Sequence, residues 1–132
     1  MPLVRIDLLQ GKSAEYRRAI GDAVLEALVA TFNVPPDDRF QIVTEHAPND
    51  FIVDANYLGI QRSADCVIIQ LTVSDTRTVD QKRALYKAIA DNLNRRLALR
   101  REDVFINLLE VRVENWSFGN GEAQYAPRPS SL

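Results

Sequence analysis

The side chains able to do covalent or metal chemistry are few in this chain. His46 is its only histidine, so a Ser-His-Asp triad would have to run through it, and no nucleophile elbow accompanies it. A lone histidine in a polar stretch is expected to be a solvated surface residue. Cys66, the only cysteine, opens an apolar run and is expected to be a small core side chain. The chain has no Gly-rich phosphate loop, and with no cluster at metal-ligand spacing we expect no metal.

The residue whose position offers unusual reactivity is Pro2. A small residue in this position favours removal of Met1, and excision would expose a secondary amine at the start of the first strand. An α-amine titrates near ~8, much closer to neutrality than a lysine does. Desolvation would lower its pKa and make it a base, whereas a neighbouring carboxylate would raise the pKa and make it an acid. The plain alternative is that Pro2 only permits trimming of Met1.

An internal repeat relates the two halves of the chain. Sliding the sequence by 65 residues aligns it with itself without a gap, and Asp38 falls on Asp103. Other matched pairs are Ser13 with Thr78, Arg17 with Lys82, Leu28 with Leu93, Phe40 with Phe105, and Glu45 with Glu110. Val67 matches Pro2 but lies mid-chain, where it has no free amine. One copy therefore keeps a potentially reactive terminus, and the other supplies scaffold and partner groups.

The first copy reads as strand, helix, strand. Residues 3–9 alternate between apolar and polar side chains, which indicates a strand. Ser13 is a suitable N-cap for the helix that follows. Asn33 and Pro35-Pro36 end that helix. Its apolar stripe consists of Tyr16, Ile20, Val24, Ala27 and Leu28, and a second strand is expected around Phe40, Ile42 and Val43.

The second copy repeats this order. Residues 66–73 are a β-branched run typical of a central strand, and Thr78 with Gln81 forms a capping box for the next helix. Leu85, Ile89 and Leu93 carry its apolar stripe, and residues 104–109 return as a strand. The linker is expected over 46–65, and the proline- and serine-containing segment 126–132 is expected to fray or to lie over a neighbour.

These elements predict one domain over 1–132, of the α/β (α+β-like) class. Its β-α-β units cover about 2–50 and 66–115, and a C-terminal tail covers 116–132. A crossover helix makes the two strands of each unit parallel, with a right-handed connection. The two units give a four-stranded sheet with both helices on one face. The other face then needs covering, so we expect subunits to pack sheet-side inward.

Composition bounds the function classes. The 132 residues are 46% hydrophobic and 26% charged, with a net charge of −2. An ordinary composition excludes collagen-like, disordered and disulfide-scaffold proteins. The charge offers no footprint for nucleic acid or an anionic membrane, and we expect neither as a partner. No apolar run approaches a membrane span of roughly 18 residues, so a cytoplasmic protein is expected.

Four stretches of the sequence resemble the tautomerase superfamily, and within it the malonate semialdehyde decarboxylase group. They are the N-terminal strand from Pro2 to Leu8, the segment 34–41 with its Pro-x-x-Asp-Arg element, Arg77, and the Trp-Ser-Phe-Gly-x-Gly element within 115–121. The resemblance covers nearly the whole chain. It implies a 4-oxalocrotonate tautomerase-like fold, a homotrimer and no cofactor.

The resemblance also implies site roles. Pro2 would act as a cation, Arg77 would hold a substrate carboxylate, and Asp38 would lie near both. Trp116 and Phe118, with Tyr125, would wall the pocket. Some decarboxylases of this kind have a second arginine two residues before Arg77, where this chain has Asp75. Substrate choice is therefore left open.

Three hypotheses follow. The first is a decarboxylase acting on a small 3-oxo acid such as malonate semialdehyde. The second is a keto–enol tautomerase that uses neutral Pro2 as a base on an enolpyruvate of the phenylenolpyruvate or 2-hydroxymuconate type. The third is a non-enzymatic binding trimer that has kept the fold. Each residue alone also has a structural explanation, since Asp38 could be a turn cap, Arg77 a solvated loop residue and Trp116 plain core. The three together near one amine favour function.

Overall fold

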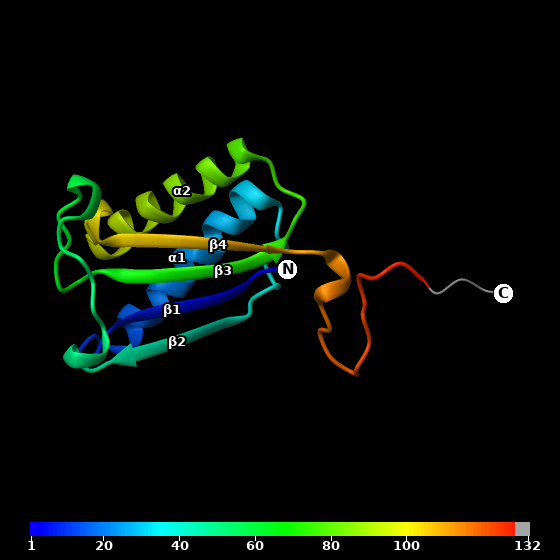
Figure 1. Cartoon of the computed structure of the whole chain (residues 1–132), viewed down its shortest axis with the longest axis horizontal. Helices are drawn as coiled ribbons and strands as arrows, with labels where there is room; N and C mark the ends of the chain where they lie inside the picture. The colour runs from blue at the N-terminus through cyan, green and yellow to red at the C-terminus, as the bar shows by residue number, and fades with distance from the viewer. Residues whose placement is uncertain (129–132) are drawn as a thin grey trace.

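Two helices cover one face of a four-stranded sheet in this protein, as Figure 1 shows. The structure, a computed structural model, describes residues 1–128. Its strands are β1 (Leu3–Leu9), β2 (Gln41–His46), β3 (Val67–Ser74) and β4 (Val104–Val111), and its longer helices are α1 (Ala14–Phe32) and α2 (Val79–Leu97). The expected fold class is confirmed.

The strand order is β2-β1-β3-β4. β1 pairs with β2, and β3 with β4, in parallel, as the crossover helices require. The two units meet in the middle of the sheet, where β1 and β3 run antiparallel and Ile6 lies opposite Ile69. The start of β1 therefore lies at the same end of the sheet as the ends of β3 and β4. This arrangement decides which residues can meet.

The helix boundaries match their sequence signals. The Ser13 hydroxyl accepts a hydrogen bond from the Tyr16 N–H at 3.0 Å. Thr78 and Gln81 form the expected reciprocal capping box. The residues that cap the C-termini of α1 and α2 are Asn33 and Ala98, both in the left-handed region, with φ of 56° and 53°. The two caps are 65 residues apart, so the repeat extends to backbone conformation.

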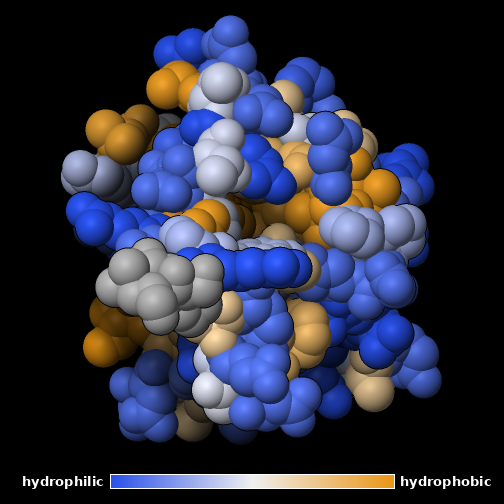
Figure 2. Space-filling model, turned by 90° about the vertical axis from the view of Figure 1, so that its right-hand side faces the viewer, coloured by the Kyte–Doolittle hydropathy of each residue, from blue (hydrophilic) through white to orange (hydrophobic). Residues whose placement is uncertain are grey.

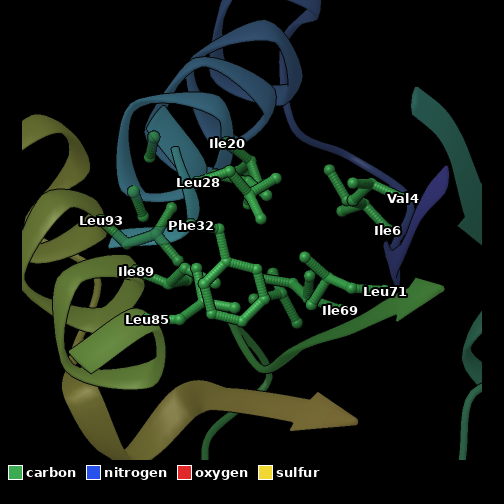
Figure 3. Packing of buried hydrophobic residues seen from close by; sticks show 14 of the residues in the cluster. Val4, Ile6, Ile20, Leu28, Phe32, Ile69, Leu71, Leu85, Ile89 and Leu93 are labelled. Atoms are coloured by element: carbon green, nitrogen blue, oxygen red, sulfur yellow. The ribbon is translucent and has the colours of Figure 1, made fainter. Parts of the chain in front are cut away.

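The core lies between the helices and the covered face of the sheet. Every second residue of β1 and β3 points into it, and α1 and α2 contribute their apolar stripes from the other side, as Figure 3 shows. Phe32 is the largest fully buried side chain. Burying one large apolar side chain contributes about 1.5–3 kcal/mol, so this layer holds both units together.

Four sequence-based expectations need correction. His46 is the last residue of β2 and not the first of the linker, and the linker holds two short 3-10 turns, Pro48–Asp50 and Tyr57–Gly59. Phe40 lies just before β2 and is 53% exposed. β3 spans Val67–Ser74, so Cys66 lies just before the strand, and β4 extends to Val111. The expectation for 126–132 falls largely on residues 129–132, which lie outside the described residues.

The opposite face of the sheet, which we call the open face, carries the alternate residues of each strand. Ile42, Phe105 and Leu109 are each more than two-fifths exposed on it, and Gln70 donates a hydrogen bond to Asn107 at 3.1 Å. No helix covers this side in Figure 1. Within residues 1–128, no helix has both the length and the apolar character needed to cross a membrane.

Candidate active site

One end of the sheet brings together segments that are far apart in the sequence. The start of β1, the ends of β3 and β4, and the chain between α1 and β2 all meet there, at the end marked N in Figure 1. A cavity of about 200 Å³ opens at this end. Its lining residues are Pro2, Leu3, Phe40, Trp116, Ser117 and Phe118. Figure 2 looks onto this end and shows hydrophobic side chains exposed among hydrophilic ones.

Asp38 places a buried carboxylate beside the N-terminus. Its backbone N–H donates to the Pro35 carbonyl at 3.0 Å, which turns the chain inward after α1. The side chain is almost fully buried, and neither carboxylate oxygen has a hydrogen-bond partner within the described residues. The Met1 ammonium lies 3.4 Å from Oδ2. Because an unpaired buried charge is costly, this terminal amine is the cation that compensates the carboxylate.

The repeat supplies an internal comparison for Asp38. Asp103, its equivalent in the second copy, is fully buried but well satisfied. Its two oxygens accept hydrogen bonds from the Ser63 backbone N–H at 2.6 Å and from the Ser63 hydroxyl at 2.7 Å. The chain that precedes β3 therefore satisfies the hydrogen bonding of Asp103, and Arg100 lies 3.8 Å from Oδ2 as its cation, while the corresponding place before β1 holds a terminal amine. The aspartate therefore has a structural role in the second copy, as Asp103, whereas in the first copy Asp38 is left to interact with the terminal amine.

Three aromatic rings form a wall, of which Trp116 and Phe118 line the cavity beside Pro2, whereas Tyr125 packs on Phe118 and does not line the cavity. The Trp116 and Phe118 rings stack with centroids 5.4 Å apart, and Tyr125 meets Phe118 edge-on at 4.8 Å. Loss of hydration raises the pKa of the Tyr125 hydroxyl, and the negative charge of Asp38 raises it further. The wall therefore stays neutral at physiological pH. Trp116 and Phe118 therefore give the cavity an apolar, uncharged side next to Pro2.

Arg77 lies at the same end of the sheet but not on the cavity. Its Nη2 donates to the Phe32 carbonyl at 2.6 Å, and its guanidinium lies 5.0 Å from the Phe32 ring centroid. The side chain thus caps the C-terminus of α1. Asp75 is exposed, and its backbone N–H donates to the Val111 carbonyl at 2.9 Å.

His46 and Cys66 lie at the opposite end of the sheet. The prediction of a solvated His46 is wrong, because Nε2 lies 2.6 Å from Oδ1 of Asp7 and the ring stacks on Phe51. Cys66 is 2% exposed, as expected for a core side chain, and burial raises the pKa of its thiol. Within residues 1–128, no group of three His, Cys, Asp or Glu side chains could hold a metal ion.

Sequence reasoning missed Leu3, Phe40 and Ser117 as lining residues. The sequence could have indicated Leu3 and Phe40, because the alternation of side chains along β1 and β2 assigns both residues to the open face. Ser117 carried none beyond its place inside the Trp-Ser-Phe element.

Two family profiles described as "Tautomerase enzyme" match residues 2–61 and 38–119, and together they span both copies. The probable tautomerase YusQ of Bacillus subtilis is 38% identical over 124 residues, which are 94% of this chain and 98% of that protein. The chain belongs to the tautomerase family. Its resemblance to that superfamily, and to the malonate semialdehyde decarboxylase group, is confirmed.

Solved structures of the family have the same fold as this chain. FG41 malonate semialdehyde decarboxylase, inhibited by 3-bromopropiolate, is 45% identical with a TM-score of 0.87 and covers 93% of each chain. A fused 4-OT protein, described as a symmetric trimer, is 26% identical with a TM-score of 0.76 and covers 96% of this chain and 99% of its own. Tautomerase-family structures of this shape thus include trimers.

Proposed function

We propose that this tautomerase-family enzyme is a decarboxylase of small 3-oxo acids that works through the Pro2 amine. The observation that carries the proposal is the buried Asp38 carboxylate beside a small cavity lined by Pro2 and by aromatic rings. Within residues 1–128, the cation paired with this carboxylate is the terminal ammonium of Met1. The 45% identity to a malonate semialdehyde decarboxylase supports the substrate class. A cavity of about 200 Å³ suits a substrate of few heavy atoms.

The chemistry needs an acid at the substrate carbonyl. Removal of Met1 would leave Pro2 as the terminal amine next to Asp38, and a nearby carboxylate favours its protonated form. When the bond between the carboxylate carbon and the α-carbon breaks, its electron pair passes to the carbonyl oxygen as an enolate. Protonated Pro2 stabilises that oxygen by a charge-assisted hydrogen bond. CO2 leaves as the carbon–carbon bond breaks, and the α-carbon of the enolate then takes a proton from solvent, which gives the aldehyde when the substrate is malonate semialdehyde. Neutral Pro2 offers a second route, by forming an iminium.

Arg77 would anchor the leaving carboxylate. Its guanidinium has five N–H donors in a fixed fork, of which Nη2 donates to the Phe32 carbonyl and Nη1 to the Thr76 hydroxyl, so part of this capacity is left for a substrate. To reach a substrate beside Pro2, the side chain has to turn from the end of α1 towards the cavity. The Trp116 and Phe118 rings would exclude water from the cavity. Exclusion of water destabilises the substrate carboxylate more than it destabilises the transition state.

A keto–enol tautomerase acting on enolpyruvates is the alternative. The family membership and the "probable tautomerase" description of YusQ favour it. This reaction uses neutral Pro2 as a base, so the two activities differ in the charge of one amine. A non-enzymatic trimer would need neither the protonated nor the neutral form of the Pro2 amine.

The test begins with mass spectrometry of the purified chain, because retained Met1 would turn the Pro2 nitrogen into an amide and abolish both enzyme activities. NMR titration of the Pro2 amine follows. A pKa well above 7 supports the acid and the decarboxylase, and one below 7 supports the base. A substrate screen then compares 3-oxo acids, enolpyruvates and 3-haloacrylates.

Variants complete the test. Pro2→Ala, which keeps a primary and more mobile amine, is expected to lose far more activity than His46→Ala or Cys66→Ala at the opposite end of the sheet. Equal losses in the three variants would indicate a general stability effect and would contradict a role for Pro2.

A further inference from the structure

The aromatic wall is carried by a short hairpin that leaves the sheet after β4. The chain passes through a 3-10 turn, Val113–Asn115, and then forms an isolated antiparallel bridge between Gly119 and Glu122. Asn120 and Gly121 at the tip have φ of 61° and 67°. Two consecutive positive φ values define the tight turn that Asn-Gly favours. Figure 1 shows this segment extending beyond the end of the sheet.

Gln124 closes the hairpin with both ends of its amide. Its Oε1 accepts from the Phe118 backbone N–H at 2.9 Å, and its Nε2 donates to the Gly119 carbonyl at 2.8 Å. These two bonds fix the amide in one orientation, and neither glutamate nor an apolar residue can make both. The side chain thereby holds the segment between Phe118 and Tyr125 in one shape.

Ser74 joins this segment to the sheet. It is the last residue of β3, and its Oγ accepts a hydrogen bond from Nε1–H of Trp116 at 3.1 Å. An indole N–H is a donor only and needs such a partner when it is partly buried. Within residues 1–128, this is the one hydrogen bond from the segment 116–128 to the rest of the protein.

We propose that Ser74 and Gln124 are positioning residues that set the distance between the aromatic wall and the Pro2 amine. Gln124 shapes the hairpin, and Ser74 holds the Trp116 ring against the cavity. The kinetic consequence rests on the proposed function. If either bond is lost, the wall moves away from Pro2 and water enters the cavity.

The expected defect lies in kcat. A wetter cavity stabilises the substrate carboxylate and so raises the barrier to loss of CO2. Arg77, the proposed anchor, is unchanged, so KM should change little. Loss of one hydrogen bond of this kind predicts a fall in kcat of about 3- to 10-fold for Ser74→Ala and for Gln124→Ala. Ser74→Thr keeps the hydroxyl and should restore activity.

The experiment uses the fluorescence of Trp116, the only tryptophan of the chain. Acrylamide quenching and emission maximum are measured for the parent, Ser74→Ala, Ser74→Thr and Gln124→Ala, together with kcat and KM on a small 3-oxo acid. Asn92→Ala is the matched control, since it removes a hydrogen bond of similar length (3.1 Å) that Nδ2 of Asn92 donates to the Ala23 carbonyl between the helices. It should lower stability without changing the quenching of Trp116.

Stronger quenching and red-shifted emission in Ser74→Ala and Gln124→Ala, but not in Ser74→Thr or Asn92→Ala, would support the proposal. Quenching identical to the parent in both deletion variants would overturn it. So would stronger quenching accompanied by unchanged kcat in an active enzyme. If the parent turns over no 3-oxo acid, the proposed function fails instead, and the fluorescence comparison still decides the positioning role.

Discussion

Arg77 and Asp75 are two neighbouring charged residues with different expected roles. Arg77→Ala removes a charge-assisted contact worth about 1.5–3 kcal/mol, so kcat/KM on a carboxylate substrate should fall roughly 10- to 150-fold. A fall in kcat would place Arg77 in the transition state, and a rise in KM would make it a binding residue. Arg77→Lys keeps the charge but loses the fork, and should recover only part of the loss.

Asp75 provides the control for that measurement. Its side chain is exposed, so Asp75→Asn should leave kcat/KM on malonate semialdehyde unchanged. A clear gain in turnover would show that the carboxylate faces the pocket. An Arg77→Ala enzyme with unchanged kcat/KM on every carboxylate tried would refute the anchoring role and favour the tautomerase.

Tyr125 reports the charge of Asp38. Loss of hydration and then this charge hold the pKa of Tyr125 above its ordinary value of about 10. Because both disfavour tyrosinate in the folded state, Tyr125's contribution to stability is present below that ordinary value and is lost as the pH rises through the raised pKa. Asp38→Asn removes the repulsion and should lower the pKa of Tyr125. Ultraviolet titration, with Tyr125→Phe to identify the step, measures the change; an unchanged pKa would contradict the coupling.

At the scale of elements, the two helix ends offer a matched pair. Ala98 and Asn33 are both exposed and both left-handed, but only alanine pays the steric cost of that conformation, roughly 1–2 kcal/mol. Ala98→Gly should therefore stabilise the protein by about 0.5–1 kcal/mol after the entropy of glycine is counted. Asn33→Gly should change stability by only about a few tenths of a kcal/mol. Denaturant unfolding measures both, and equal effects would contradict the explanation.

At the scale of the whole molecule, the open face predicts self-association. It exposes Ile42, Phe105 and Leu109 beside polar groups that already pair within the chain, and such a face is typical of an interface. We expect a homotrimer by light scattering. Phe105→Asp should shift the mass towards the monomer, because it places a charge in the interface. Val79→Asp, which changes an exposed apolar residue at the start of α2, should leave the trimer intact. A clean monomer mass for the parent would contradict the prediction.

The sequence by itself determined the elements and their order. Alternation in β1, the caps at Ser13 and Thr78, and the stripes of both helices are local signals, because strand and helix periods depend on neighbouring residues. Parallel pairing within each unit followed from the crossover helices. The free amine at Pro2 was predicted from the residue types and the aromatic wall from the family resemblance, and the free amine and both catalytic roles stay predictions.

Only the tertiary structure decided which of these residues meet. Asp38 and Asp103 are the same residue in the two copies, yet Ser63 satisfies one, while the terminal ammonium faces the other. That difference arises because folding brings a different preceding segment to each aspartate, Ser63 before β3 and the N-terminus before β1. No local sequence pattern predicts these two contacts. Likewise Arg77 of the second unit reaches the Phe32 carbonyl of the first, and Ser74 at the end of β3 reaches Trp116 beyond the end of β4. Contacts between distant segments depend on packing geometry, and for that reason they appear only once the chain has folded.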